Sequence, residues 1–208
     1  MTSFFVCGTD TGVGKTIVTG LLARTFLGEG YSVITQKWVQ TGSKGFPQDI
    51  AAHLKMMGRK KSHVRGLEDL VCPYVFKYPA SPHLAARLER KKVEVRKIKS
   101  AYKKLCGMFD IVIVEGVGGA LVPLNEKTLL LDVVKELKIP VVLVVGNKLG
   151  AINHTLLTVE AIKKRGLKIA GLVFNETEKG GQAIKRDNIK IINKMMKAGT
   201  YVCLQNLR

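Results

Sequence analysis

The sequence predicts a single α/β domain over residues 1–208, built on one doubly wound, mostly parallel sheet with helices on both faces. Short apolar runs alternate with longer segments of helical pattern along the whole chain, as strands and crossover helices do in a parallel sheet. The runs at 111–114 and 140–145 are apolar at almost every position, which is typical of strands buried on both faces. A length of 208 residues is sufficient for one such domain with a full core.

The expected elements alternate along the chain. We expect strands at residues 4–7, 31–36, 111–114, 140–145 and 169–174, with shorter strands at 74–76 and 201–204. We expect helices at residues 16–27, 47–57, 81–90, 93–108, 129–137, 150–164 and 180–196, and a polar, basic loop at 58–66. The helical spacing of apolar residues, with glycine or proline near the segment ends, supports these bounds.

The segment GTDTGVGKT at residues 8–16 joins the first expected strand to the first helix. Glycines allow successive backbone N–H groups to turn toward one anion, and the helix N-terminus adds partial positive charge. In this pattern the amides of residues 12 to 16 surround the phosphates, Lys15 reaches the β- and γ-phosphates, and the Thr16 hydroxyl binds Mg²⁺. Thr9 stands where the usual pattern has glycine. We therefore expect a fold of the P-loop NTPase type, with a generic glycine-rich turn as the alternative.

Polar residues also follow two other expected strands. Glu115 ends the apolar run at 111–114 and precedes a glycine-rich loop, which is the Walker B arrangement for holding Mg²⁺. Lys37 and Thr41 follow the strand at 31–36. Ligands of open parallel sheets bind at the carboxyl ends of the strands, so both residues are placed for chemistry. Lys37 as a plain surface lysine, and Asp49 as a charge at a helix N-terminus, stay open alternatives.

Composition limits which partners and which cellular compartment we expect for the protein. The net charge is +18, spread over segments such as 59–61, 90–92 and 163–165 without interleaved aromatic residues. We read it as a lysine-rich solvated surface and expect no nucleic-acid and no membrane partner, although such a charge also suits polyanions. No apolar run approaches 18 residues, and no signal peptide is expected. Four scattered cysteines match neither zinc spacing nor a disulfide scaffold, which fits a reducing, cytoplasmic setting.

Five segments together resemble the dethiobiotin synthetase family over roughly residues 3–200. They are GTDTGVGKT at 8–16, KWVQTG at 37–42, PASPH at 79–83, VEGVGG at 114–119 and VGNKLGAINH at 145–154. The resemblance implies an enzyme that converts 7,8-diaminononanoate, CO₂ and ATP to dethiobiotin, ADP and phosphate. The implied route passes through a carbamate and a carbamic-phosphoric anhydride. It also implies Mg²⁺ as cofactor and a symmetric homodimer with a substrate site shared between subunits.

The resemblance assigns roles to individual residues. It implies catalytic roles for Lys37, Lys15 and Thr11, and Mg²⁺ ligands at Thr16, Asp49 and Glu115. The implied nucleotide contacts are Gly12, Val13, Gly14, Lys15, Thr16, Ile17, Glu115, Gly116, Val117, Gly118 and Asn175, the last reading adenine. The implied substrate contacts are Thr11, Lys37 and Thr41, with Leu149, Gly150, Ala151, Ile152 and Asn153 meeting the distant carboxylate from a second subunit.

The sequence departs from the family pattern in places, and other functions compete. Trp38 and Gln40 replace smaller residues beside Lys37, and the segment before Asp49 is shorter than the family pattern. A P-loop amidoligase acting on another substrate is one alternative. A partitioning-type ATPase with a basic surface is a second, but such enzymes usually carry an additional lysine early in the loop, where this chain has Asp10. A nucleic-acid-binding module would rest on the net charge only.

Overall fold

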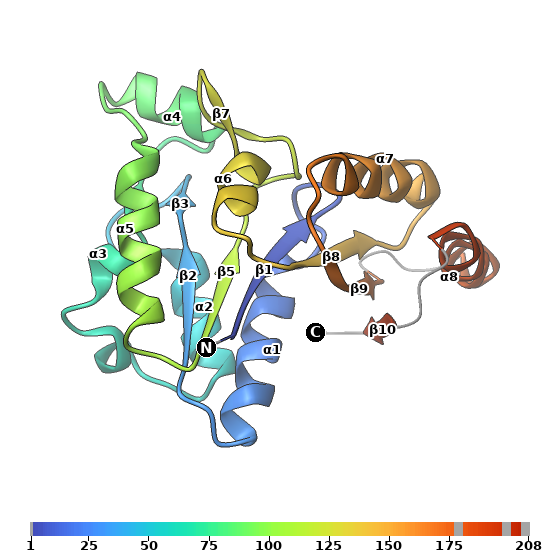
Figure 1. Ribbon diagram of the computed structural model, residues 1–208, viewed down its shortest axis with the longest axis horizontal. Helices are drawn as coiled ribbons and strands as arrows, with labels where there is room; N and C mark the ends of the chain where they lie inside the picture. The colour runs from blue at the N-terminus through green and yellow to red at the C-terminus, as the bar shows by residue number, and fades with distance from the viewer. Residues whose placement is uncertain (1, 177–180, 197–200, 205–208) are drawn as a thin grey trace.

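The computed structural model describes residues 2–176, 181–196 and 201–204, the last four by their backbone alone. Its centre is one six-stranded sheet in the order β10-β9-β8-β1-β5-β2, and all five neighbouring pairs are parallel (Figure 1). The strands are β1 (Thr2–Gly8), β2 (Val33–Lys37), β5 (Ile111–Glu115), β8 (Val141–Gly146), β9 (Ile169–Asn175) and β10 (Tyr201–Leu204). The predicted fold class is confirmed, and this sheet is parallel throughout.

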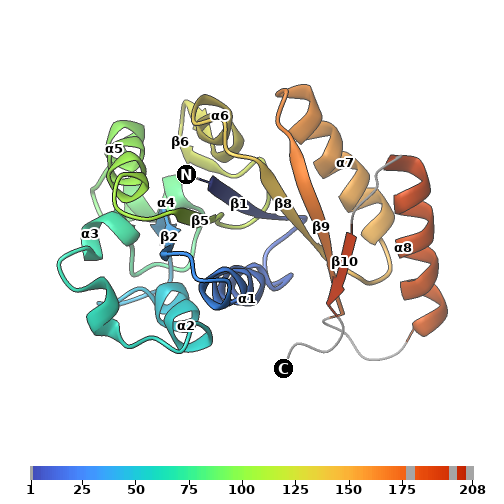
Figure 2. The same cartoon turned by 60° about the horizontal axis from the view of Figure 1, so that its bottom comes forward.

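Helices cover both faces of this sheet, because alternate strand residues enter two separate apolar clusters. Val6 and Ile113 pack with α1 residues such as Val18, whereas Phe5 and Val112 pack in the larger cluster. Figure 2 shows α1 on one side of the sheet and α6 and α7 on the other. The helices are α1 (Lys15–Gly28), α2 (Gln48–Met56), α3 (Glu68–Val71), α4 (Pro82–Leu88), α5 (Val95–Cys106), α6 (Leu130–Glu136), α7 (Ala151–Lys164) and α8 (Gln182–Met196).

The pairing register of the central strands determines which side chains meet at the carboxyl edge. β5 is buried at all five positions, in agreement with its apolar run. β2 is also buried at all five positions, although its last three residues are Thr35, Gln36 and Lys37. Lys37 pairs in register with Glu115 across β2 and β5. Two charged residues therefore end neighbouring strands at the same height, inside the protein.

The structure differs from the expectations in short elements. The expected loop at 58–66 contains a 3₁₀ turn, η1 (Lys61–Val64), and α3 follows. Val64 and Val71 are buried in the larger cluster, and this packing orders a segment whose local composition is polar and basic. The expected strand near 74 is β4 (Tyr74–Val75), which pairs in parallel with β3 (Val39–Gln40). The hairpin β6 (Pro123–Asn125) with β7 (Thr128–Leu129) has too few apolar residues to be visible in the sequence. The expected start of the last helix at Gly180 lies outside the described residues.

Candidate active site

The loop between β1 and α1 has the geometry of a phosphate cradle. Gly12 and Gly14 have φ angles of 75° and 97°, in the left-handed region that glycine adopts without strain. Lys15 is the first residue of α1, and its Nζ donates to the backbone oxygen of Asp10 at 2.8 Å. The φ angle of Thr9 is not positive, so a threonine adopts this backbone conformation without strain where the usual pattern has glycine. The predicted loop is thus present with its lysine held against the loop backbone.

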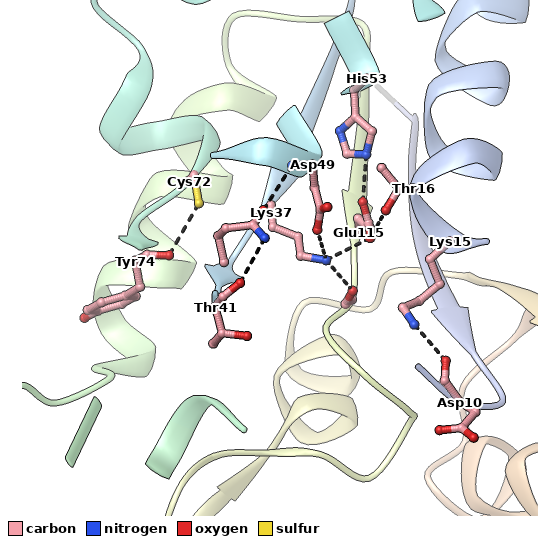
Figure 3. Close-up of polar contacts among 12 residues, drawn as sticks. Asp10, Lys15, Thr16, Lys37, Thr41, Asp49, His53, Cys72, Tyr74 and Glu115 are labelled. Atoms are coloured by element: carbon pink, nitrogen blue, oxygen red, sulfur yellow. Dashed lines mark hydrogen bonds and ion pairs between the residues drawn. The ribbon is translucent and has the colours of Figure 1, made fainter. Parts of the chain in front are cut away.

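Lys37 and Glu115 form the centre of a buried network beside this loop (Figure 3). The Lys37 ammonium donates to Glu115 Oε1 at 2.8 Å and to the Gly116 carbonyl at 2.9 Å, and lies 2.7 Å from Asp49 Oδ2. Lys37 is 4% exposed and Glu115 is 2% exposed. An isolated buried charge is costly, so the three acceptors around one ammonium are what makes this burial tolerable. The reading of Lys37 as a surface lysine is excluded.

Thr16 and Asp49 complete a set of oxygen donors around Glu115. The Thr16 hydroxyl donates to Glu115 Oε1 at 3.0 Å. Two ligands of an octahedral Mg²⁺ ion with bonds of about 2.1 Å lie roughly 3 Å apart, so this pair has a suitable spacing. No group of three or more His, Cys, Asp and Glu side chains suited to a metal occurs in the described part of the chain. Thr16 and the two carboxylates offer hard oxygen atoms, the kind of ligand that Mg²⁺ prefers.

His53 belongs to the same network and was not predicted from the sequence. Its Nε2 lies 2.7 Å from Glu115 Oε2, and its side chain is fully buried. The Glu115 carboxylate only accepts hydrogen bonds, so Nε2 carries the hydrogen and donates it. Nδ1 is buried and has no hydrogen-bond partner among the residues that the structure describes. A signal was available: Asp49 and His53 are four residues apart on one helix and thus share a face.

The network changes the pKa values of its members. Burial alone would raise the pKa of Glu115, but the Lys37 charge and the His53 hydrogen bond overcome it and lower that pKa to about 2. Burial would lower the pKa of Lys37, but Glu115 and Asp49 outweigh it and the pKa is raised. Burial, followed by the neighbouring Lys37 charge, lowers the pKa of Lys15. Glu115 is thus a carboxylate at neutral pH, and Lys37 is its paired cation.

Trp38 and Gln40, which depart from the family pattern beside Lys37, pack and hydrogen-bond inside the protein next to the site. Trp38 is 1% exposed, and its indole N–H donates to Gln36 Oε1 at 2.9 Å. Gln36 in turn donates from Nε2 to the Leu70 carbonyl at 2.8 Å. The Gln40 side chain accepts from the backbone N–H of Asp49 at 3.1 Å, which anchors the first turn of α2. The two residues that depart from the family pattern thus contribute internal packing and hydrogen bonds. Asp49 lies beside Lys37, although the segment that contains it also departs from the pattern.

Asn175 lies against the phosphate loop. Its Nδ2 donates to the Val13 carbonyl at 3.0 Å. A Cβ on Gly14 would approach that Nδ2 to 2.1 Å, so the close contact requires glycine. Gly118, with φ of 62°, lies in the loop after β5. A Cβ added at Gly118 would lie 3.6 Å from the Thr11 hydroxyl oxygen, so this loop faces Thr11. Gly118 and Asn175 therefore lie beside the phosphate loop.

The remaining predicted contacts are less closely grouped. Thr41 is half-buried beside Lys37, and its carbonyl accepts from Gln40 Nε2 at 3.3 Å (Figure 3). Gly150 precedes α7 with φ of 87°. Leu149 is 81% exposed and Asn153 is also exposed, whereas Ala151 is buried. Asn153 makes no hydrogen bond to the other predicted site residues within the described ranges. Within the described ranges, the Lys37 ammonium makes its polar contacts with Asp49, Glu115 and Gly116, and none with residues 149–153.

The low pKa of Glu115 predicts a dependence of stability on acid pH. A carboxylate whose pKa falls on folding stabilises the protein above its unfolded pKa near 4.5, and loses that contribution as pH falls through about 2. We expect the free energy of unfolding to fall by a few kcal/mol across this window, and Glu115→Gln to flatten the slope. Urea denaturation at a series of pH values measures it. An equally steep slope in Glu115→Gln would assign the effect to other acids.

Removing His53 should leave one oxygen of a buried carboxylate without its donor. We expect His53→Leu to lower the free energy of unfolding by about 2–3 kcal/mol, the range for hydrogen bonds to charged groups. The same change in a Glu115→Gln background should cost clearly less, because the charge that needs the donor is gone. Urea denaturation of the four proteins gives the coupling free energy. A coupling near zero would mean that His53 acts through packing alone.

Comparison with known proteins identifies the family. A family model described as an AAA domain matches residues 2–207. The ATP-dependent dethiobiotin synthetase BioD of Chlorobaculum tepidum is 42% identical over 192 residues, covering 92% of this chain and 80% of the relative. BioD 2 of Pasteurella multocida is 39% identical over 193 residues, covering 93% and 90%. BioD 2 of Haemophilus influenzae is 43% identical over 171 residues, covering 82% and 89%.

Solved structures support the fold. A ParA family ATPase from Chlorobium tepidum superposes with a TM-score of 0.61 at 12% identity, covering 99% of this chain and 85% of that one. MinD, in the MinC:MinD cell division complex of Aquifex aeolicus, gives 0.58 at 14% identity, covering 98% and 81%. At such identities the likeness concerns the fold alone. With the phosphate loop, the Lys37–Glu115 pair and the close relatives taken together, the chain belongs to the ATP-dependent dethiobiotin synthetase family.

Proposed function

We propose that this protein forms dethiobiotin from 7,8-diaminononanoate, CO₂ and ATP, with release of ADP and phosphate. The observation that carries the proposal is a pair of buried lysines at the carboxyl edge of the sheet. Lys15 lies in the phosphate loop, and Lys37 ends β2. A reaction that joins a carbamate to a γ-phosphate gathers several negative oxygens in one place. Two desolvated cations lower the energy of that charge more than exposed lysines would.

The nucleotide is proposed to bind on the loop at 12–17. The backbone N–H groups and the α1 N-terminus attract the phosphates, and Lys15 would release the Asp10 carbonyl to contact them. Asn175 is proposed to read adenine, because a carboxamide can pair with its N6 and N7 edges. Its Nδ2 contact with Val13 places it next to the loop. The segment 115–118 would close the opposite side of the nucleotide.

The proposed chemistry has three steps. One substrate amine attacks CO₂ and loses a proton, giving a carbamate. A carbamate oxygen then attacks the γ-phosphorus, ADP leaves, and a carbamic-phosphoric anhydride results. The second amine attacks the carbonyl carbon, the C–O bond to phosphate breaks, and the cyclic urea forms. Lys37 and Lys15 would neutralise the oxygens of the middle step, while the hydroxyls of Thr11 and Thr41 orient the carbamate end.

Mg²⁺ is the proposed cofactor, held by Thr16, Asp49 and Glu115. The oxygen donors and the 3.0 Å spacing between Thr16 and Glu115 support this assignment. When bound, the ion would neutralise phosphate charge and orient the triphosphate. Lys37 contacts both carboxylates, so the ammonium and the ion would share the same pair of acids.

A symmetric homodimer is the proposed assembly. Leu149 and Asn153 are exposed at the start of α7 and make no contact with Lys37 of their own chain that the structure describes. The helix start at Gly150 to Asn153 offers N–H groups and a partial positive charge to the substrate's distant carboxylate. This segment of one subunit would thus serve the phosphate-loop site of its partner.

The proposed setting is the cytoplasm. Cys7, Cys72 and Cys106 are free thiols, and burial raises the pKa of Cys7 and Cys72 to about 12, which makes both unreactive. Among the described residues, no helix combines the length and the apolar character needed to cross a membrane.

Loss of either buried lysine should abolish most of the turnover. We expect Lys15→Ala and Lys37→Ala each to lower kcat by about 10²-fold or more, as removal of a preorganised electrostatic partner does. Lys164→Ala, an exposed lysine at the end of α7, is the control and should keep normal turnover. The assay follows ADP release with and without diaminononanoate and bicarbonate, with folding checked by circular dichroism. ADP release that ignores both co-substrates would favour another P-loop ATPase, and normal kcat in Lys37→Ala would remove its catalytic role.

Asp49→Asn should weaken the binding of Mg²⁺. The variant keeps the shape of the side chain but removes one anionic oxygen, so we expect about tenfold more Mg²⁺ for half-maximal effect. Calorimetric titration of ADP at increasing Mg²⁺ measures this without turnover, and the initial rate gives a second measure. An unchanged Mg²⁺ dependence would restrict Asp49 to pairing with Lys37.

Inactive subunits should complement each other if the site is shared. We expect the Lys37→Ala and Asn153→Ala proteins to be poorly active alone. In a heterodimer of the two, one of the two sites contains both intact residues. Random mixing makes about half of all dimers heterodimers, so the mixture should recover up to about a quarter of normal activity. Mixing after mild denaturation, with differently tagged subunits to verify heterodimers, makes the test conclusive. Heterodimers without recovered activity would contradict the shared site.

A further inference from the structure

A second hollow lies away from the phosphate loop. It has a volume of about 660 Å³ and is bounded by α4, the segment leading into α5 and the β6–β7 hairpin, which lie together at the upper left of Figure 1. Buried Ala86, Val93 and Leu124 contribute apolar surface to it. None of its lining residues belongs to the Lys15, Lys37 and Glu115 site. This volume is within the range of small-molecule pockets.

The lining of the hollow is strongly basic. It contains two acidic residues, Glu94 and Glu126, against six basic ones: Arg87, Arg90, Lys91, Lys92, Arg96 and Lys127. Lys91 pairs with Glu89 at 3.2 Å. The guanidinium groups of the three arginines make no ion pair within the described ranges. The two acids offset only part of this positive charge, and an anionic ligand would offset more of it.

Arg90 occupies a backbone conformation that arginine rarely adopts. Its φ is 52°, and it is one of two non-glycine residues with positive φ in the described part of the chain. Its N–H donates to the Arg87 carbonyl, and the next N–H donates to the Ala86 carbonyl, which ends α4 in the way that glycine usually does. Arginine is therefore present where glycine would fold more readily.

We propose that this hollow binds a small organic anion carrying at least two phosphate or carboxylate groups. The guanidinium groups of Arg87, Arg90 and Arg96 would take the anionic oxygens, because their planar donors match phosphate and carboxylate in a bidentate manner. The apolar surface would contact the carbon skeleton. The proposed reaction involves only a few of the basic side chains behind the high net charge. Binding of an anion in the hollow would give a function to several of the others. The inference does not depend on the proposed reaction.

The test uses inorganic pyrophosphate and citrate as separate probes of the two anion chemistries. Calorimetric titration at about 0.15 M salt, where exposed charges are screened beyond roughly 8 Å, compares wild type with Arg87→Gln/Arg96→Gln. We expect the variant to bind its preferred probe about tenfold more weakly, as loss of charge-assisted hydrogen bonds predicts. The matched control is Arg24→Gln/Arg59→Gln, which removes two exposed arginines elsewhere and should bind normally.

Amide chemical shifts of the wild-type protein locate the probe even if the double variant folds poorly. Shifts in 90–96 and 124–128 support the proposal. Shifts confined to residues 8–16 would overturn it, because the probe would then occupy the phosphate loop. Equal weakening in both double variants would also overturn it, since binding would then follow net charge. A change of molecular mass in the hollow variant alone, measured by light scattering, would assign the hollow to a subunit contact instead.

Discussion

The contact between Lys37 and Glu115 is the interaction on which the rest of the site depends. It exists because β2 and β5 pair in parallel and in a register that ends both strands at these two residues. Glu115 accepts from the first helix through Thr16, from β2 through Lys37 and from α2 through His53. One carboxylate at the end of β5 thus joins three elements: α1 with its phosphate loop, β2 and α2. Its charge is tolerated in the interior only because each partner is present.

The same contact explains why polar residues occupy a buried strand. The last three positions of β2 are polar yet buried, and the last two of them make internal polar contacts. Gln36 connects Trp38 to the Leu70 carbonyl, and Lys37 connects two acids. Trp38 fills the core against Phe5 with ring centres 5.4 Å apart. Polar bonding and apolar packing therefore fix the position of the Lys37 backbone from both sides, which matters because catalysis by charge requires a preorganised cation.

Much of this arrangement could be predicted from the sequence, and the reasons for the rest are physical. Glycine spacing with Lys15 and Thr16 determines the loop locally, and the apolar run before Glu115 indicates a buried strand. Position and resemblance place Lys37 and Asp49 at the site, but the contact of Lys37 with Glu115 depends on strand register, which the sequence does not show. His53 shares a helix face with Asp49, but its contact with Glu115 depends on a residue 62 positions later. The turn η1 depends on the burial of Val64, a tertiary effect.

The central position of β1 has a consequence for how the chain is assembled during synthesis. β1 is made before both of its inner neighbours, because it pairs on one side with β5 and on the other with β8, more than a hundred residues later. Such non-local pairings are slow to form, because a long loop must close before any contact compensates for the lost entropy. The apolar β1 must therefore remain without its sheet partners until most of the chain has been made. An exposed strand edge of this kind is prone to aggregation, so the folding yield of the enzyme depends on protection of β1 until β5 and β8 have been made.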